Sequence, residues 1–128
     1  MNSKGDFSYL PYTVEQRLES YKNAHWPFDE GSRVPLKLAE AGFVFVGDDS
    51  NPDQVKCIVC QCEVDCWEEC DDPFAEHKGA EPKCPLVKMK NPYKPLTLGD
   101  VLKLEKKANE FLMVSVVYLN ILTLDPNC

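Results

Sequence analysis

Three cysteines and one histidine have the types and spacing of ligands for a metal ion. Cys57 and Cys60 form a C-x₂-C pair, and His77 and Cys84 complete the pattern C-x₂-C-x₁₆-H-x₆-C. Thiolate and imidazole are the ligands of closed structural zinc sites, and a tight knuckle between two cysteines places both sulfurs on one side of the ion. Because the protein fills all four positions, none is left for a catalytic water. The spacing predicts one structural Zn²⁺; the alternatives are a redox-active pair or ordinary buried cysteines.

The other cysteines bear on the redox compartment. The chain has seven cysteines, and all but Cys128 lie between residues 57 and 84. An odd number does not suit a disulfide framework, and the first residues lack the apolar segment of a secretory signal. We therefore expect a reducing compartment. Cys62 could compete as a zinc ligand; the alternative interpretation is that Cys62, Cys66 and Cys70 are all incidental small side chains.

Length and charge limit the class of protein. A chain of 128 residues fits one domain with a short appendage. With 14 basic and 21 acidic residues its net charge is -7, which disfavours non-specific binding of nucleic acid. An acidic surface suits a basic partner or a free N-terminal amine. No nucleophile stands beside a plausible base outside the cysteine and histidine set, so we do not expect an enzyme.

Short elements must position the four ligands, and their pattern predicts an α+β fold. Apolar residues recur at helical spacing from Thr13, and Asp72 followed by Pro73 is a typical helix start. Glycines are placed to end two of the helices. The expected helices are a segment from Thr13, Pro35–Ala41 ended by Gly42, Pro73–Lys78 ended by Gly79 and a segment from Thr97; the expected strands are Phe43–Val46, Val55–Val59 and Val64–Trp67.

Several segments together resemble a known family. They are Arg17 ahead of Trp26-Pro27, the run Ala39–Phe43, Val55 with the C-x₂-C pair, and Asp71-Asp72-Pro73 ahead of His77 and Cys84. This pattern is similar to the baculoviral IAP repeat, or BIR domain. The run Leu96–Glu105 resembles the survivin-like branch, whose members have a single BIR domain and a C-terminal helix.

The resemblance implies a domain organisation and a fold. It implies an N-terminal arm at 1–12, a BIR zinc domain at 13–88, a linker at 89–96 and a C-terminal helix with an apolar tail at 97–128. The implied fold is a small three-stranded antiparallel sheet with short helices, held by one zinc.

The resemblance also implies an adaptor that inhibits apoptosis and acts in mitosis. Survivin-like members belong to the chromosomal passenger complex, bind a histone tail that begins with a free alanine, and present a helix to two partner helices. This implies the cytoplasm, the nucleus, the centromere and the spindle midzone as locations. The alternative is a regulator of caspases that binds alanine-starting IAP antagonists and has no mitotic role.

The family pattern places a peptide groove beside the third strand. Asp65 and Asp71 match the acidic residues that receive the peptide amine, Trp67 matches the aromatic wall, and Val64 belongs to the same groove. Because Asp65 and Trp67 are two residues apart on a strand, we expect them to share a face. A carboxylate pairs with an ammonium group through charge-assisted hydrogen bonds.

Three positions near the groove depart from the survivin-like pattern. Cys62 stands in place of a lysine and Ala80 in place of a histidine, and Cys66 replaces a glycine. The first two replaced residues are associated with phosphate recognition in the family. Since neither replacement is positively charged, we expect little recognition of a phosphorylated tail.

The C-terminal region combines a familiar helix start with an unusual tail. Thr97 and Asp100 form a capping-box-like start. Tyr93, Leu98, Val101 and Leu102 are expected to pack against the domain or against a second copy in a homodimer. The run 111–124 is mostly apolar, but it is shorter than the roughly 20 residues of a membrane span. We interpret it as a divergent or truncated tail that favours self-association and weakens assembly with the passenger partner helices; the alternative is an apolar partner-binding helix.

Overall fold

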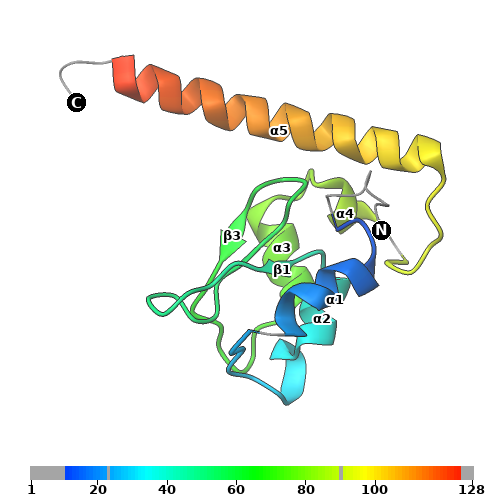
Figure 1. Ribbon diagram of the computed structural model, residues 1–128, viewed down its shortest axis with the longest axis vertical. Coiled ribbons are helices and arrows are strands. Elements are labelled where there is room, and N and C mark those ends of the chain that lie inside the picture. Colours follow the sequence, from blue (N-terminus) through cyan, green and yellow to red (C-terminus); the bar gives the residue numbers. More distant parts are fainter. Residues whose placement is uncertain (1–10, 23, 90, 125–128) are drawn as a thin grey trace.

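Short helices surround a small sheet, and one long helix lies across this body (Figure 1). The computed structural model describes residues 11–22, 24–89 and 91–124, with side chains as far as residue 114. The α+β class and the C-terminal helix are therefore confirmed. The expected arm falls mostly outside the described residues. The elements are α1 (Val14–Lys22), η1 (Gly31–Arg33), α2 (Pro35–Glu40), β1 (Val44–Phe45), β2 (Val55–Lys56), β3 (Glu63–Val64), α3 (Pro73–Ala80), α4 (Pro85–Lys88) and α5 (Leu98–Leu124).

The three strands form one antiparallel sheet in the order β1-β2-β3. Val55 lies opposite both Phe45 and Val64, so it sits at the centre of the ladder. Each strand has two residues and is shorter than predicted. The second strand stops because Cys57 already belongs to the knuckle: its N–H donates to the Cys62 carbonyl, and its carbonyl accepts from Gln61 N at 2.8 Å.

Two of the predicted helix boundaries are confirmed and one is wrong. Gly42 follows α2 with φ +108°, a left-handed conformation that favours glycine. Asp72 caps α3 by accepting a hydrogen bond from Ala75 N at 3.1 Å, and Pro73 occupies the first turn. Gly79 does not end α3, which continues to Ala80 and is closed by a bond from Glu81 N to the His77 carbonyl. A glycine costs helix stability but ends a helix only where the backbone turns left-handed.

A buried arginine joins the first helix to the second. The Arg17 side chain is 1% exposed, and its Nε donates to the Ala39 carbonyl at 2.7 Å. Its Nη1 donates to the carbonyls of Tyr12 and Pro11. Burial lowers the pKa of Arg17 from its usual value, yet a guanidinium stays charged. Arg17 therefore has a structural role, because its planar donors satisfy carbonyls from two segments.

The long helix starts as predicted but packs through a different face. Thr97 N donates to Asp100 Oδ2 at 3.0 Å, and Asp100 N donates to Thr97 Oγ1 at 3.1 Å, which is a reciprocal capping box. Leu104 and Ala108 are buried in the domain core, with Val101 and Phe111 half-buried beside them.

The expectation that Leu98 and Leu102 pack against the domain is therefore wrong. Their side chains are 75% and 55% exposed, and Tyr93 is also exposed, with its hydroxyl donating to Glu40 at 2.6 Å. Contact of these residues with a second copy stays a prediction. Among the described residues, no helix is both long and apolar enough to cross a membrane.

Candidate functional site

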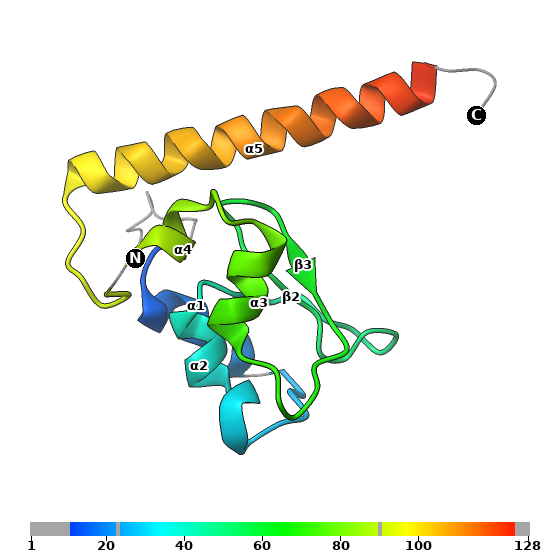
Figure 2. The same cartoon turned by 180° about the vertical axis from the view of Figure 1, so that it is seen from behind.

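The structure brings the four predicted metal ligands together in the core. The Sγ atoms of Cys57, Cys60 and Cys84 and a ring nitrogen of His77 all lie within 4.8 Å of one another, and all four residues are buried. The knuckle after β2 supplies the first two residues, α3 supplies His77, and Cys84 directly precedes α4. Figure 2 shows α4 between α3 and the first turns of α5, so the cluster ties the sheet to the helices beneath α5.

The distances within the cluster fit a tetrahedral zinc site. Cys57 Sγ lies 3.7 Å from Cys84 Sγ, and Cys60 Sγ lies 3.5 Å from His77 Nε2. With Zn–S bonds of about 2.3 Å and Zn–N bonds of about 2.0–2.1 Å, tetrahedral geometry places two sulfurs about 3.8 Å apart and a sulfur about 3.6 Å from a nitrogen. The residues present therefore fit one zinc held entirely by protein ligands.

A backbone hydrogen bond on the side away from the three sulfurs fixes the orientation of the His77 ring. His77 Nδ1 donates to the Ala41 carbonyl at 2.5 Å, which leaves Nε2 facing the three sulfurs. Gly42 allows this close approach: a Cβ at that position would lie 3.0 Å from His77 Cε1 and 3.2 Å from Leu86 Cδ1. The family-like glycine after α2 thus both turns the chain and makes room for the imidazole.

The electrostatics of the metal-free cluster favour a bound cation. Burial acts to lower the pKa of His77, but hydrogen bonds with the Cys60 and Cys84 sulfurs and the Ala41 carbonyl outweigh it and raise that pKa to about 9. Hydrogen bonds with Cys57, Cys62 and Cys84 lower the pKa of Cys60. Hydrogen bonds with Cys60 and Cys84 raise the pKa of Cys57, so without a metal the charge of the cluster rests on Cys60 and the other groups share its protons. A bound metal ion would displace these protons.

Cys62 stands outside the four gathered ligands. It is half-buried on the chain beyond the knuckle, and its carbonyl accepts from Cys57 N at 3.0 Å. Its backbone thus supports the knuckle, whereas its sulfur is not one of the atoms gathered within 4.8 Å.

The predicted groove residues lie next to one another but do not share one face. Val64 is half-buried at the end of β3, Asp65 is exposed, and Trp67 is 4% exposed. The expectation from strand geometry is wrong here because Cys66 has φ +57°, which ends the alternation of an extended strand.

The indole of Trp67 forms the apolar part of this region. Its ring stands edge-on to Phe43 at a centroid distance of 6.0 Å, and its buried Nε1 has no hydrogen-bond partner among the described residues. The backbone on either side is held by Asp53, whose carboxylate accepts from Cys66 N at 3.0 Å and from Trp67 N at 2.9 Å. Sequence reasoning missed Asp53, because its turn is joined to residue 66 only in the folded chain.

Two carboxylates meet beside the tryptophan. Carboxylate oxygens of Glu68 and Asp71 lie within 4.8 Å of each other and of Cys70 Sγ. Asp71 is half-buried: its Oδ2 accepts from Glu68 N at 2.8 Å, and its carbonyl accepts from Ser32 Oγ at 2.6 Å. Asp71 is therefore fixed in place as a candidate amine acceptor. Glu68 is a partner that the sequence analysis did not single out.

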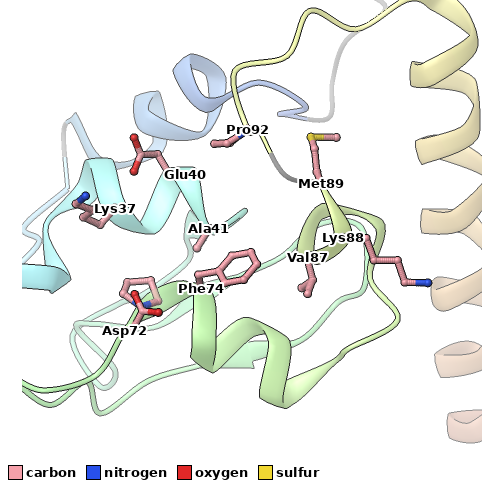
Figure 3. Close-up of a pocket in the computed structure, with 10 residues that line it drawn as sticks. Lys37, Glu40, Ala41, Asp72, Phe74, Val87, Lys88, Met89 and Pro92 are labelled. Atoms are coloured by element: carbon pink, nitrogen blue, oxygen red, sulfur yellow. The ribbon is translucent and has the colours of Figure 1, made fainter.

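A cleft of about 410 Å³ opens between α2, α3 and α4 (Figure 3). Phe74, Val87 and Met89 give it an apolar lining, and Glu40 and Asp72 lie at its α2 and α3 side. None of the predicted groove residues lines it. Ala41 also lines this cleft, and its carbonyl is the one that orients His77. The cleft therefore lies beside a residue that supports the metal site.

Comparisons with known proteins agree with this arrangement. A family model described as the Inhibitor of Apoptosis domain, BIR, matches residues 17–88. The chain is 38% identical over 111 residues to Baculoviral IAP repeat-containing protein 5.2-A of Xenopus laevis, covering 86% of this chain and 69% of that protein. It is also 38% identical over 97 residues to Baculoviral IAP repeat-containing protein 5 of Cavia porcellus, covering 75% of this chain and 67% of that protein.

Solved structures show the same fold. The DIAP1 BIR1 domain bound to a Grim peptide matches with a TM-score of 0.53 and 28% identity, over 76% of this chain and 91% of that one. The autoinhibited dIAP1-BIR1 domain matches with a TM-score of 0.52 and 30% identity, over 76% and 93% respectively.

Proposed function

The chain belongs to the inhibitor of apoptosis (BIR) family, and we propose that it is a zinc-stabilised, survivin-like adaptor that binds peptides beginning with a free alanine. The zinc is structural, since four protein ligands fill its coordination sphere. The recognition is performed by the region around β3 and the loop that leads to α3.

One observation carries the proposal: two close carboxylates stand beside a tryptophan. Glu68 and Asp71 lie within 4.8 Å of each other, next to Trp67 in the chain. Two neighbouring carboxylates attract a cation, and a peptide ammonium can donate up to three hydrogen bonds to them. Trp67 is 4% exposed and its Nε1 is buried, so the indole contributes the small apolar edge that it leaves exposed, next to the first side chain of the peptide.

We propose a mitotic partner first. The resemblance to survivin-like proteins supports a histone tail as the ligand and assembly with the passenger-complex helices. It also supports four locations: the cytoplasm, the nucleus, the centromere and the spindle midzone. The matched DIAP1 domain was solved with a Grim peptide, which supports an IAP antagonist as the second candidate ligand. In that case the protein would act on caspase regulation without a mitotic role.

A peptide titration tests the groove. Alanine-starting peptides with a free and with an acetylated amine are compared on the zinc-loaded protein. Asp71→Asn keeps an oxygen that can accept from Glu68 N but removes the charge, so binding of the free amine should weaken by about 1.5–3 kcal/mol. Glu19→Gln, far from the groove on α1, is the control. Equal affinity for the free and acetylated peptides would overturn the proposal.

The same titration separates the two partner classes. A basic, histone-like tail and an antagonist-like apolar peptide, both beginning with alanine, are compared. We expect phosphorylation of the third residue to change affinity little, because Cys62 and Ala80 carry no positive charge. A gain of about tenfold, or about 1.4 kcal/mol, would show that another cation such as Lys78 or Lys83 reads the phosphate.

A further inference from the structure

A second pocket, of about 330 Å³, lies where α4 meets the first turns of α5. Its floor is apolar and is formed by Pro85, Met89, Leu96 and Leu104. Its rim carries five of the chain's 14 basic residues, although the net charge of the protein is -7. These are Lys83, Lys88, Lys94, Lys103 and Lys107.

The lysines converge from separate segments of the chain. Lys103 and Lys107 are one helical turn apart, so they lie on the same face of α5. Lys88 extends from α4 toward α5 (Figure 3). Lys83 and Lys94 come from the loop before α4 and from the linker before α5. Like charges gathered in this way repel one another, and nothing in the fold of the sheet or the zinc site requires them here.

The positive charge at this pocket is largely unmatched by the protein itself. Lys107 pairs with Glu110 at 3.3 Å, but no carboxylate of the described residues lies within 4.0 Å of the other four ammonium groups. Asp100 is the one acidic residue in the lining, and it offsets only part of the charge: hydrogen bonds from Thr97, followed by the nearby charges of Lys94 and Lys103, lower its pKa. An external anion would therefore find donors that are not already used.

We propose that this lysine-rimmed pocket binds an acidic peptide segment of a partner protein. An apolar side chain of the segment would enter the floor, and carboxylates on either side would meet the lysines. Lysines on flexible stems suit several dispersed charges, whereas a single phosphate is better held by arginine forks or backbone N–H groups. A polynucleotide is disfavoured because it would extend onto the surface of a strongly acidic protein.

The pocket is separate from the amine-binding groove and has the opposite charge. None of Val64, Asp65, Trp67 and Asp71 lines it. The groove attracts a cationic peptide terminus, and the pocket attracts an anionic segment. The two sites can therefore receive different ligands at the same time, which goes beyond the proposed reader function and does not depend on it.

Matched charge reversals on α5 provide the test. The probe is a short acetylated, fluorescein-labelled peptide with a central leucine flanked on both sides by glutamates. Lys103→Glu should weaken its binding to the zinc-loaded full chain by at least about tenfold. Lys106→Glu makes the same change of net charge on the same helix, but Lys106 does not line the pocket, and it should change affinity less than about twofold. Equal effects of the two variants would overturn the proposal.

Probe variants establish the chemistry of the ligand. Replacing the glutamates with glutamine should abolish binding, and replacing the leucine with serine should weaken it by about tenfold. The groove variant Asp71→Asn should leave the affinity unchanged, so failure of the pocket and failure of the groove are distinguishable. Tighter binding to inorganic polyphosphate or to phosphatidylserine vesicles than to the peptide, again lost in Lys103→Glu, would replace the peptide with a phosphate ligand and overturn the proposal.

Discussion

At the residue scale, we expect the four metal-ligand residues to determine whether the domain folds. Four buried side chains of the core, Cys57, Cys60, His77 and Cys84, meet with the geometry of zinc ligands. In zinc-finger peptides the ion contributes about 10–16 kcal/mol of apparent free energy. Chelation of the zinc, or Cys84→Ala, should therefore unfold the domain. Circular dichroism with a zinc titration measures this, and an unchanged spectrum in the metal-free protein would contradict it.

Cys62→Ser is the matched control for the zinc prediction. Its sulfur contacts the Cys60 side chain but is not among the four gathered ligand atoms, and its backbone carbonyl holds Cys57 N whichever side chain is present. The variant should keep one zinc and a stability close to that of the unchanged protein. Loss of zinc in this variant would show that Cys62 serves as a ligand.

Cys66 carries backbone strain that a glycine would remove. Its φ of +57° is left-handed, which costs a residue with a Cβ about 1–2 kcal/mol. Cys66→Gly restores the residue type of the survivin-like pattern and should raise the free energy of unfolding by about 0.5–1 kcal/mol, since the greater freedom of glycine in the unfolded chain offsets part of the gain. Denaturant midpoints measure it. Cys70→Gly, at a described position without positive φ, should destabilise instead.

The cluster of three cysteines and one histidine could be predicted from sequence, because residue type and spacing carry its chemistry. The groove was less accessible. Asp53 reaches residue 66 across 13 positions, and Glu68 acquires its role only through its distance from Asp71. The expectation that Asp65 and Trp67 share a face required a strand through both residues, but β3 ends at Val64 and Cys66 has a left-handed backbone. Local periodicity contains no information about such a turn.

At the scale of elements, α5 shows what periodicity can and cannot determine. The capping box and the helical spacing predicted the helix, and both are present. Two apolar sets satisfy the helical period, however: Leu98 with Leu102, and Leu104 with Ala108. The second set faces the domain because the linker places α5 over α4. The local sequence pattern does not specify this placement.

Paired truncations test this choice of face. Leu104 is 5% exposed, so Leu104→Ala should destabilise the docking of α5 by about 2–3 kcal/mol. Leu102 is 55% exposed, and Leu102→Ala should change it by less than about 0.5 kcal/mol. Amide hydrogen exchange along α5 measures the difference. If Leu102→Ala loosened the helix more than Leu104→Ala, this helix would dock through its other face.

At the scale of the whole molecule, charge is divided between two regions. The loop from Glu68 to Asp72 is acidic, and the junction of α4 with α5 is basic. A net charge of -7 hides this division. Because the regions have opposite sign, one chain can bridge a cationic terminus and an anionic segment, which is the behaviour required of an adaptor.

The outer end of α5 should make the protein associate with itself. Leu112, Met113 and Val114 are 46%, 58% and 69% exposed, so apolar side chains already face solvent where the helix leaves the domain. An exposed apolar surface on a helix is stabilised by burial against another copy. Deleting residues 111–128 should shift the protein toward the monomer and improve solubility, while zinc content and peptide affinity stay the same. Sedimentation at several concentrations measures the shift. If the full chain is monomeric and binds the passenger partner helices tightly, this prediction is wrong and the tail binds a partner protein instead.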